Sequence, residues 1–170
     1  SIRGALTNRD SGYGSYETTY QEIRQALIAA AVDPQVKAIV LYINSGGGAV
    51  TGISDTANLI RKVDGIKPVH AFTDGMMCSA AYWLGCSARS VKATEMSEVG
   101  SIGVITTHMS FFRMYQEVGI DATVIRAGEF KALGHPMEQL SDKAKGVIQA
   151  QLDQMYGMFA SYVADRRGMS

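Results

Sequence analysis

The sequence predicts an α/β fold, with a largely parallel sheet, flanking helices and a long C-terminal helix. Short runs rich in β-branched residues alternate along the chain with segments in which apolar residues recur at helical spacing. This alternation is typical of strands that pair in parallel through right-handed helical crossovers. The final helical segment, residues 141–167, is the longest. A chain of 170 residues has the length of one domain, and we expect residues 1–170 to form a single domain.

The first predicted elements are a loop and a helix. Residues 8–15 contain two glycines and several small polar side chains, a composition typical of a loop. Thr18 or Thr19 is suited to be the N-cap of the helix that follows. Gln21 or Glu22 would complete a capping box. The residues that share its apolar face are Tyr20, Ile23, Leu27 and Ala30.

A central strand and a second helix come next. Asp33-Pro34 ends the first helix, and residues 36–43 form a β-branched run without clean alternation. Such a run predicts a strand in the middle of a sheet that is covered on both faces. The strand leads into the loop "NSGGGAV" and then into a helix over residues 52–63. The aligned apolar residues of this helix are Ile53, Ala57 and Ile60.

The same order of elements repeats in the rest of the chain. Strands are expected at residues 67–72, 89–94, 101–106 and 121–126. Helices are expected at residues 78–88, 110–118 and 141–167. The apolar side of the last helix carries Ala144, Ile148, Met155, Phe159, Tyr162 and Val163.

Composition excludes several classes of function. The 16 basic and 16 acidic residues balance, so no overall field attracts nucleic acid or an anionic membrane. No apolar stretch in this chain is long enough to span a bilayer. Cys78 and Cys86 match no metal-ligand spacing and the three histidines do not cluster, so we expect no metal, no cofactor and no disulfide. The chain begins at Ser1, and what precedes it stays open.

Two loops qualify as the site, because ligands bind beyond the carboxyl ends of parallel strands. The first contains Gly46, Gly47 and Gly48, whose exposed N–H groups could cradle a phosphate, bind an oxyanion or simply form a tight turn. Neither phosphate-binding glycine motif fits in register. The second loop contains Ser79 in "DGMMCSAAYWLGC". Ser79 is either a tolerated serine in a buried helix or a nucleophile whose small neighbours leave room for a substrate. Two residues could be its base, His108 or Lys131, and a lysine acts as a base only in its neutral form.

Four motifs in order resemble the S49 family of serine peptidases, the signal peptide peptidase A type, which has a ClpP/crotonase-like fold. These motifs are "YINSGGGAV", "GMMCSAAYW", "VGSIGVI" and "AGEFKALGHP". The resemblance extends from Ile2 to Met169. It implies that Ser79 is the nucleophile and Lys131 the general base.

The resemblance also implies roles for other residues. Ser101 would orient the lysine, and the backbone N–H groups of Gly47 and Ala80 would form the oxyanion hole. The backbone edges that pair with a substrate strand would be at Ala49, Val50, Ile102 and Gly103. One departure is Gly46, which stands where the family usually has proline and makes the loop more flexible.

The family's partners are peptides and proteins rather than nucleic acids. The resemblance implies a homo-oligomer with sites near subunit interfaces, and cleavage either of signal peptides or of phage scaffold and capsid-associated proteins. The segment from Gly134 onward is more similar to the phage group. A phage-type protein would be cytoplasmic, whereas an anchor upstream of this chain would make it membrane-associated.

Two other functions remain open at this point. A crotonase-like acyl-CoA enzyme would share the fold but would use carboxylates such as Glu95 or Glu98 instead of Ser79. A catalytically silent assembly protein would keep the fold without using either serine or lysine. Serine-directed inhibitors and cleavage of an unfolded protein separate these alternatives from a peptidase.

Overall fold

The structure is a computed structural model that describes residues 1–8 and 17–169. It divides into two compact units, one of Ser1–Gly103 with Phe159–Ser170 and the other of Val104–Met158. The first unit holds the sheet, and the second holds the segment before the C-terminal helix and the beginning of that helix. Except for its first residue, the loop expected at residues 8–15 lies outside the described residues.

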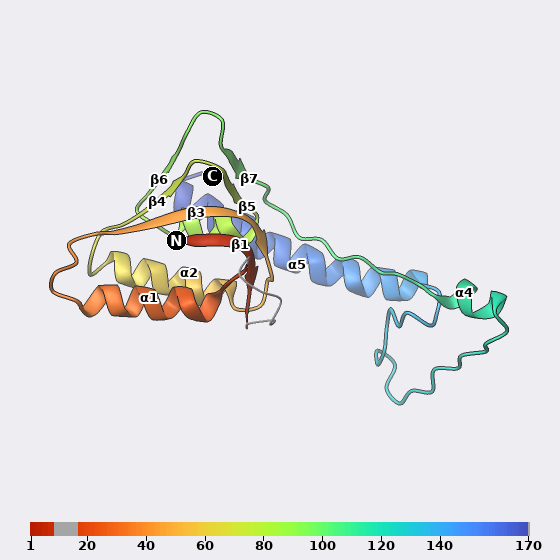
Figure 1. Ribbon diagram of the computed structural model, residues 1–170. Helices are drawn as coiled ribbons and strands as arrows, with labels where there is room; N and C mark the ends of the chain where they lie inside the picture. The colour runs from red at the N-terminus through yellow and green to blue at the C-terminus, as the bar shows by residue number, and fades with distance from the viewer. Residues whose placement is uncertain (9–16, 170) are drawn as a thin grey trace. The chain divides into compact units, whose positions relative to one another are not determined.

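The sheet of the first unit has seven parallel strands in two connected parts (Figure 1). The order in the larger part is β2-β1-β3-β4-β6. Its strands are β1 (Ile2–Thr7), β2 (Glu17–Thr19), β3 (Ile39–Gly48), β4 (Val69–Thr73) and β6 (Ser90–Ala93). The smaller part adds β5 (Met76–Cys78), which pairs with β3, and β7 (Glu98–Gly100), which pairs with β5. The predicted parallel α/β architecture is therefore confirmed for this unit.

Three helices pack against one face of this sheet and form the core with it. They are α1 (Tyr20–Val32), α2 (Ile53–Asp64) and α3 (Ala80–Cys86), and Figure 1 shows α1 and α2 side by side. Thr19 caps α1 and forms the predicted capping box with Glu22. Most of the apolar residues predicted to face inward are buried, namely Tyr20, Ile23, Leu27, Ile53, Ala57 and Ile60. Ala30, near the end of α1, is only partly buried.

Strand β3 differs from its prediction in two ways. Its side chains alternate, so that Leu41 and Ile43 are buried whereas Val40 is 62% exposed, and within this unit only one face is covered. The strand also continues to Gly48 instead of ending before the glycines. Pairing of Gly47 and Gly48 with β1 explains this extension, because the backbone partners outweigh the low strand propensity of glycine.

The end of helix α5 (Asp142–Arg167) that belongs to the first unit seals the core beside α3. The Phe159 ring stacks on Trp83 with centroids 4.7 Å apart, and Val163 is buried. The Tyr162 hydroxyl pairs with the Ser87 hydroxyl at 2.9 Å. The long C-terminal helix and this part of its apolar side are therefore confirmed, whereas the prediction for Met155 is wrong, since its side chain is exposed. Among the described residues, no helix is both long and apolar enough to cross a membrane.

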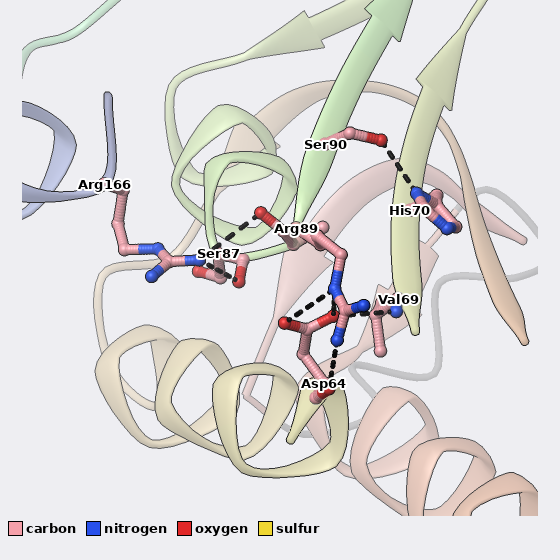
Figure 2. A network of polar contacts seen from close by, with 8 residues as sticks. Asp64, Val69, His70, Ser87, Arg89, Ser90 and Arg166 are labelled. Carbon is pink, nitrogen blue, oxygen red and sulfur yellow. Dashed lines mark hydrogen bonds and ion pairs between the residues drawn. The ribbon is translucent and has the colours of Figure 1, made fainter. Parts of the chain in front are cut away.

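A polar network holds the carboxyl ends of α2 and α3 (Figure 2). The Asp64 carboxylate accepts from the Val69 N–H at 2.9 Å and from the Arg89 side chain at 3.2 Å. The Arg166 guanidinium donates to the carbonyl oxygens of Ser87 and Ala88, which directly follow α3. A cation at this position also interacts favourably with the negative end of the helix dipole.

Arg166→Ala is expected to lower the free energy of unfolding by about 1.5 kcal/mol. This is the low end of the range for hydrogen bonds made by charged groups, because the side chain is partly exposed. Arg167→Ala is the matched control, since the neighbouring side chain is exposed and changes stability little. Urea unfolding measures both variants. Equal stabilities would contradict a structural role for the contacts of Arg166 to α3.

The chain after β7 contains less regular structure than the sequence predicts. Helix α4 (Phe112–Glu117) and the beginning of α5 match the expected helices. The strands predicted at residues 101–106 and 121–126 are wrong, since neither segment is a strand among the described residues. A strand needs a neighbouring backbone to pair with, and Ile105 and Ile125 are each 93% exposed.

Candidate active site

Ser79 lies at the junction of β5 and α3 in a strained backbone conformation. Its φ of 52° and ψ of −125° fall in a region that non-glycine residues seldom occupy. The Ser79 N–H donates to the Gly100 carbonyl at 2.7 Å, and the Ser79 carbonyl accepts from the Trp83 N–H at 3.1 Å. The predicted helix over residues 78–88 is therefore shorter, with Cys78 in β5 and Ser79 at the N-cap. Backbone strain of this kind concentrates at functional sites.

Backbone strain also marks two further motifs. Among the described residues, the non-glycine residues with positive φ are Ser79, Ser101 and Ala132. Cys78 and Gly100 are register partners that end β5 and β7, so Ser79 directly follows one of these paired strands and Ser101 the other. Ala132 directly follows Lys131. All three positions lie in or beside the motifs that the sequence singles out.

The glycine loop packs directly against the serine. An added side chain at Gly47, whose φ is 104°, would place its Cβ 2.7 Å from the Ser79 Cβ and 3.0 Å from the Ala80 nitrogen. Only glycine fits there, because both the space and the backbone conformation exclude a side chain. Ala80 is the first residue of α3, so its N–H has no partner within that helix. The Gly47 N–H donates to the Ser45 Oγ at 3.1 Å.

The segment after the glycines is held by the chain itself. The Ala49 N–H donates to the Leu6 carbonyl at 2.7 Å, and the Ala49 carbonyl accepts from the Tyr20 hydroxyl at 2.5 Å. Burial of Tyr20 raises the pKa of its hydroxyl above the usual range, so it stays a donor. The Val50 carbonyl accepts from the Ile53 N–H at 3.3 Å. Both backbone groups of Ala49 thus already have partners, and a substrate strand would have to share them.

The cysteine beside the serine is turned away from this chemistry. The Cys78 Sγ lies 3.4 Å from the Glu98 carbonyl oxygen, on the neighbouring strand. Burial raises the pKa of the Cys78 thiol, so it is largely protonated at neutral pH. A protonated thiol is a poor nucleophile. The hydroxyl of Ser79 is therefore the better candidate in this segment.

The second unit contains both candidate bases. Lys131 is exposed and lies in a turn closed by its N–H, which donates to the Gly128 carbonyl at 3.1 Å. The His108 ring lies beside Gly134, where an added Cβ would be 3.5 Å from its Cδ2 and 3.4 Å from the Ile148 Cδ1. The His108 Nε2 is buried, and no hydrogen-bond partner for it occurs among the described residues. The ring thus packs against apolar neighbours, whereas Lys131 is accessible.

The remaining predicted pairing residues and two unpredicted residues complete the site. Ile102 and Gly103 follow β7 outside any strand, and Ile102 is exposed. Ser45 and Tyr20, whose hydroxyls hold the glycine loop, were not predicted from the sequence. The position of Ser45 directly before the three glycines could have indicated its role, because serine often bonds the backbone two residues on. Tyr20 offered no such local signal, since its partner is 29 residues away.

Comparison with known proteins gives consistent matches. The family model described as Peptidase family S49 matches residues 61–170. Capsid assembly protease C of Escherichia phage lambda is 34% identical over 99% of this chain, and the chain covers 39% of that protein. Head-tail preconnector protein GP5 of Enterobacteria phage P21 is 35% identical over 99% of this chain, which covers 34% of it. The chain thus spans well under half of these relatives.

A solved structure is also similar. It is a ClpP1 mutant from Listeria monocytogenes, with a TM-score of 0.49 and 13% sequence identity. The match covers 99% of this chain and 72% of that one.

Proposed function

This chain belongs to peptidase family S49, and from that membership we propose that it is a serine endopeptidase with a Ser79–Lys131 dyad. The observation that carries the proposal is the strained backbone of Ser79, packed against Gly47 and the nitrogen of Ala80. A serine in this setting presents its hydroxyl beside backbone N–H groups, as acyl transfer requires.

The proposed reaction begins with the hydroxyl of Ser79. Its oxygen attacks the carbonyl carbon of the scissile peptide bond while the neutral amine of Lys131 takes the hydroxyl proton. The C–N bond then breaks, and Lys131 returns that proton to the leaving amine. Water next attacks the acyl-enzyme while Lys131 accepts one of its protons. The ester bond to the Ser79 oxygen then breaks, and Lys131 gives that proton to this oxygen as the carboxyl product leaves. Ser101 orients the lysine amine by a hydrogen bond.

Backbone donors stabilise the negative oxygen that forms at each step. The Ala80 N–H is suited to this role because no helical partner occupies it. The Gly47 N–H is the second donor. Gly47 can pack closely against Ser79 because it has no side chain. Removing one such donor from an oxyanion hole typically costs about 10²–10³ in kcat.

We propose protein segments in extended conformation as substrates. Two relatives are named for capsid assembly and for a head-tail preconnector, which supports a structural or scaffold protein of a phage particle as the target. The backbone of Val50, and of Ile102 and Gly103 after β7, would pair with the extended substrate. Self-association, with sites near subunit interfaces, accompanies this function.

Cleavage of casein tests the proposed function against the other two. A peptidase degrades this unfolded protein and is inhibited by a peptide boronate, which forms an adduct with a serine hydroxyl. An acyl-CoA enzyme that uses Glu95 or Glu98 would do neither, and nor would a silent assembly protein. Intact casein after prolonged incubation with the oligomeric protein would end the proposal.

A mixing experiment asks whether the dyad is formed within one chain or between two. Ser79→Ala and Lys131→Ala chains are each expected to be inactive. If the two residues meet across a subunit boundary, mixing these chains and allowing exchange restores up to about a quarter of the sites in a random dimer. Recovered cleavage of a fluorogenic peptide would show that the two residues meet across a subunit boundary. Mixtures that stay inactive despite proven subunit exchange would show that each site is built from one chain.

A further inference from the structure

The side chain of Ser45 connects the glycine loop to the first strand. It is 1% exposed, and its Oγ donates to the Gly4 carbonyl at 2.6 Å. The same oxygen accepts the Gly47 N–H at 3.1 Å. Gly4 is where the register between β1 and β3 shifts, so the hydroxyl fills a gap in the backbone pairing. One buried hydroxyl therefore binds two backbone groups that the strands do not pair with each other.

The Gly47 N–H is also a proposed donor of the oxyanion hole. The hydrogen bond that it makes to Ser45 therefore affects the proposed reaction as well as the fold. We infer that Ser45 is a positioning residue that competes with the oxyanion for the Gly47 N–H and so restrains the activity of the site. This inference rests on the proposed function. It makes the Ser45 contact an inhibitory one, which the substrate displaces as the tetrahedral intermediate forms.

The backbone at Gly46 has room for the local rotation that such an exchange requires, and the register pairing of β1 with Gly47 and Gly48 keeps this rotation small. Gly46 has no heavy atom within 4 Å of the place where a Cβ would be, and proline, which would restrict the backbone, is absent from this position. The far end of the loop is fixed, because the Ala49 carbonyl is bound by the Tyr20 hydroxyl. Movement is thereby confined to the peptide groups around Gly46 and Gly47. A hydrogen bond of this kind corresponds to roughly a two- to tenfold change in an equilibrium.

Ser45→Ala tests the inference because it removes the competing acceptor and leaves the loop backbone unchanged. We expect kcat for peptide cleavage to rise roughly two- to tenfold with KM nearly unchanged, since the oxyanion forms only after binding. The matched control is Ser87→Ala. Ser87 is also fully buried, and its hydroxyl donates to the Trp83 carbonyl at 2.7 Å, away from the glycine loop. Both variants should lose stability, but only Ser45→Ala should gain kcat.

Ser45→Cys provides a second variant in case the alanine variant does not fold. It retains a side chain of similar shape but replaces a strong acceptor by a weak one, so kcat should again rise. Folded Ser45→Ala or Ser45→Cys protein with kcat equal to or below that of the unchanged protein would overturn the inference. It would show instead that the hydroxyl holds the loop in its active position. Failure of the proposed function is distinct, because then the unchanged protein would not cleave peptides at all.

Discussion

Ser79→Ala is expected to abolish peptide cleavage, with a fall in kcat of at least about 10⁴-fold. The hydroxyl is the proposed attacking group, and no other nucleophile of similar reactivity replaces it in this segment. The neighbouring Cys78 does not, because burial raises the pKa of its thiol and its sulfur lies against the Glu98 carbonyl. Hydrolysis of a fluorogenic peptide by the purified protein measures the loss.

The control for this variant is again Ser87→Ala, which removes a buried hydroxyl from the same unit without touching the site. It should retain the kcat of the unchanged protein. Ser79→Ala should also keep the fold, because a smaller side chain leaves the hydrogen bond from the residue 79 N–H to the Gly100 carbonyl in place. Full peptide cleavage by folded Ser79→Ala protein would refute Ser79 as the nucleophile, and the attacking group would have to be sought elsewhere in the chain.

Lys131→Ala is expected to lower kcat by about 10²–10⁴-fold, the usual contribution of a general base. The fall has a chemical cause, since the Ser79 hydroxyl keeps its proton when no base lies beside it. His108→Ala should retain most of the activity, because the His108 ring packs beside Gly134 and Ile148 and serves the structure. Its main effect should be on the stability of the second unit.

Lys145→Ala is the matched control for the lysine substitution. Lys145 lies on an exposed part of α5 in the same unit and belongs to none of the motifs. Its replacement removes one positive charge from the unit and should leave kcat unchanged. If His108→Ala abolished cleavage and Lys131→Ala did not, the base would be the histidine, and the dyad would have to be reassigned.

The elements of the first unit could largely be predicted because their signals are local. The capping box of Thr19 and Glu22 and the helical spacing of Ile53, Ala57 and Ile60 all lie within a few residues of one another. The end of β3 was not predictable in this way. Its glycines become part of a strand because they pair with residues of β1 that are about forty positions earlier.

The strand expected at residues 121–126 shows that a local signal can also predict an element that does not form. Residues 121–126 have the β-branched composition of a strand, but composition supplies no hydrogen-bond partner. Among the described residues of the second unit, no neighbouring segment pairs with them, and the side chain of Ile125 stays exposed. Strand formation depends on the pairing backbone as much as on the residues themselves.

The site shows a similar division between local and distant signals. Ser79, Gly47 and Lys131 could be proposed from the sequence because each lies in a short motif with its neighbours in order. Ser79 has a strained φ, and the residues that directly follow it in this motif are small. The contact of Tyr20 with the glycine loop could not be predicted, because its hydroxyl reaches Ala49 only through the packing of α1 against the sheet. Contacts of this kind emerge from the fold and have no sequence pattern of their own.

The most direct measurement of the central claim is the rate at which an activated peptide ester acylates the protein, followed by intact mass and located by peptide mapping. We predict one acyl group per active site, attached to Ser79, and formation at least about 10²-fold slower in Lys131→Ala protein. An acyl group on any other residue, or equal rates in the two proteins, would contradict the proposed pairing of this serine with this lysine.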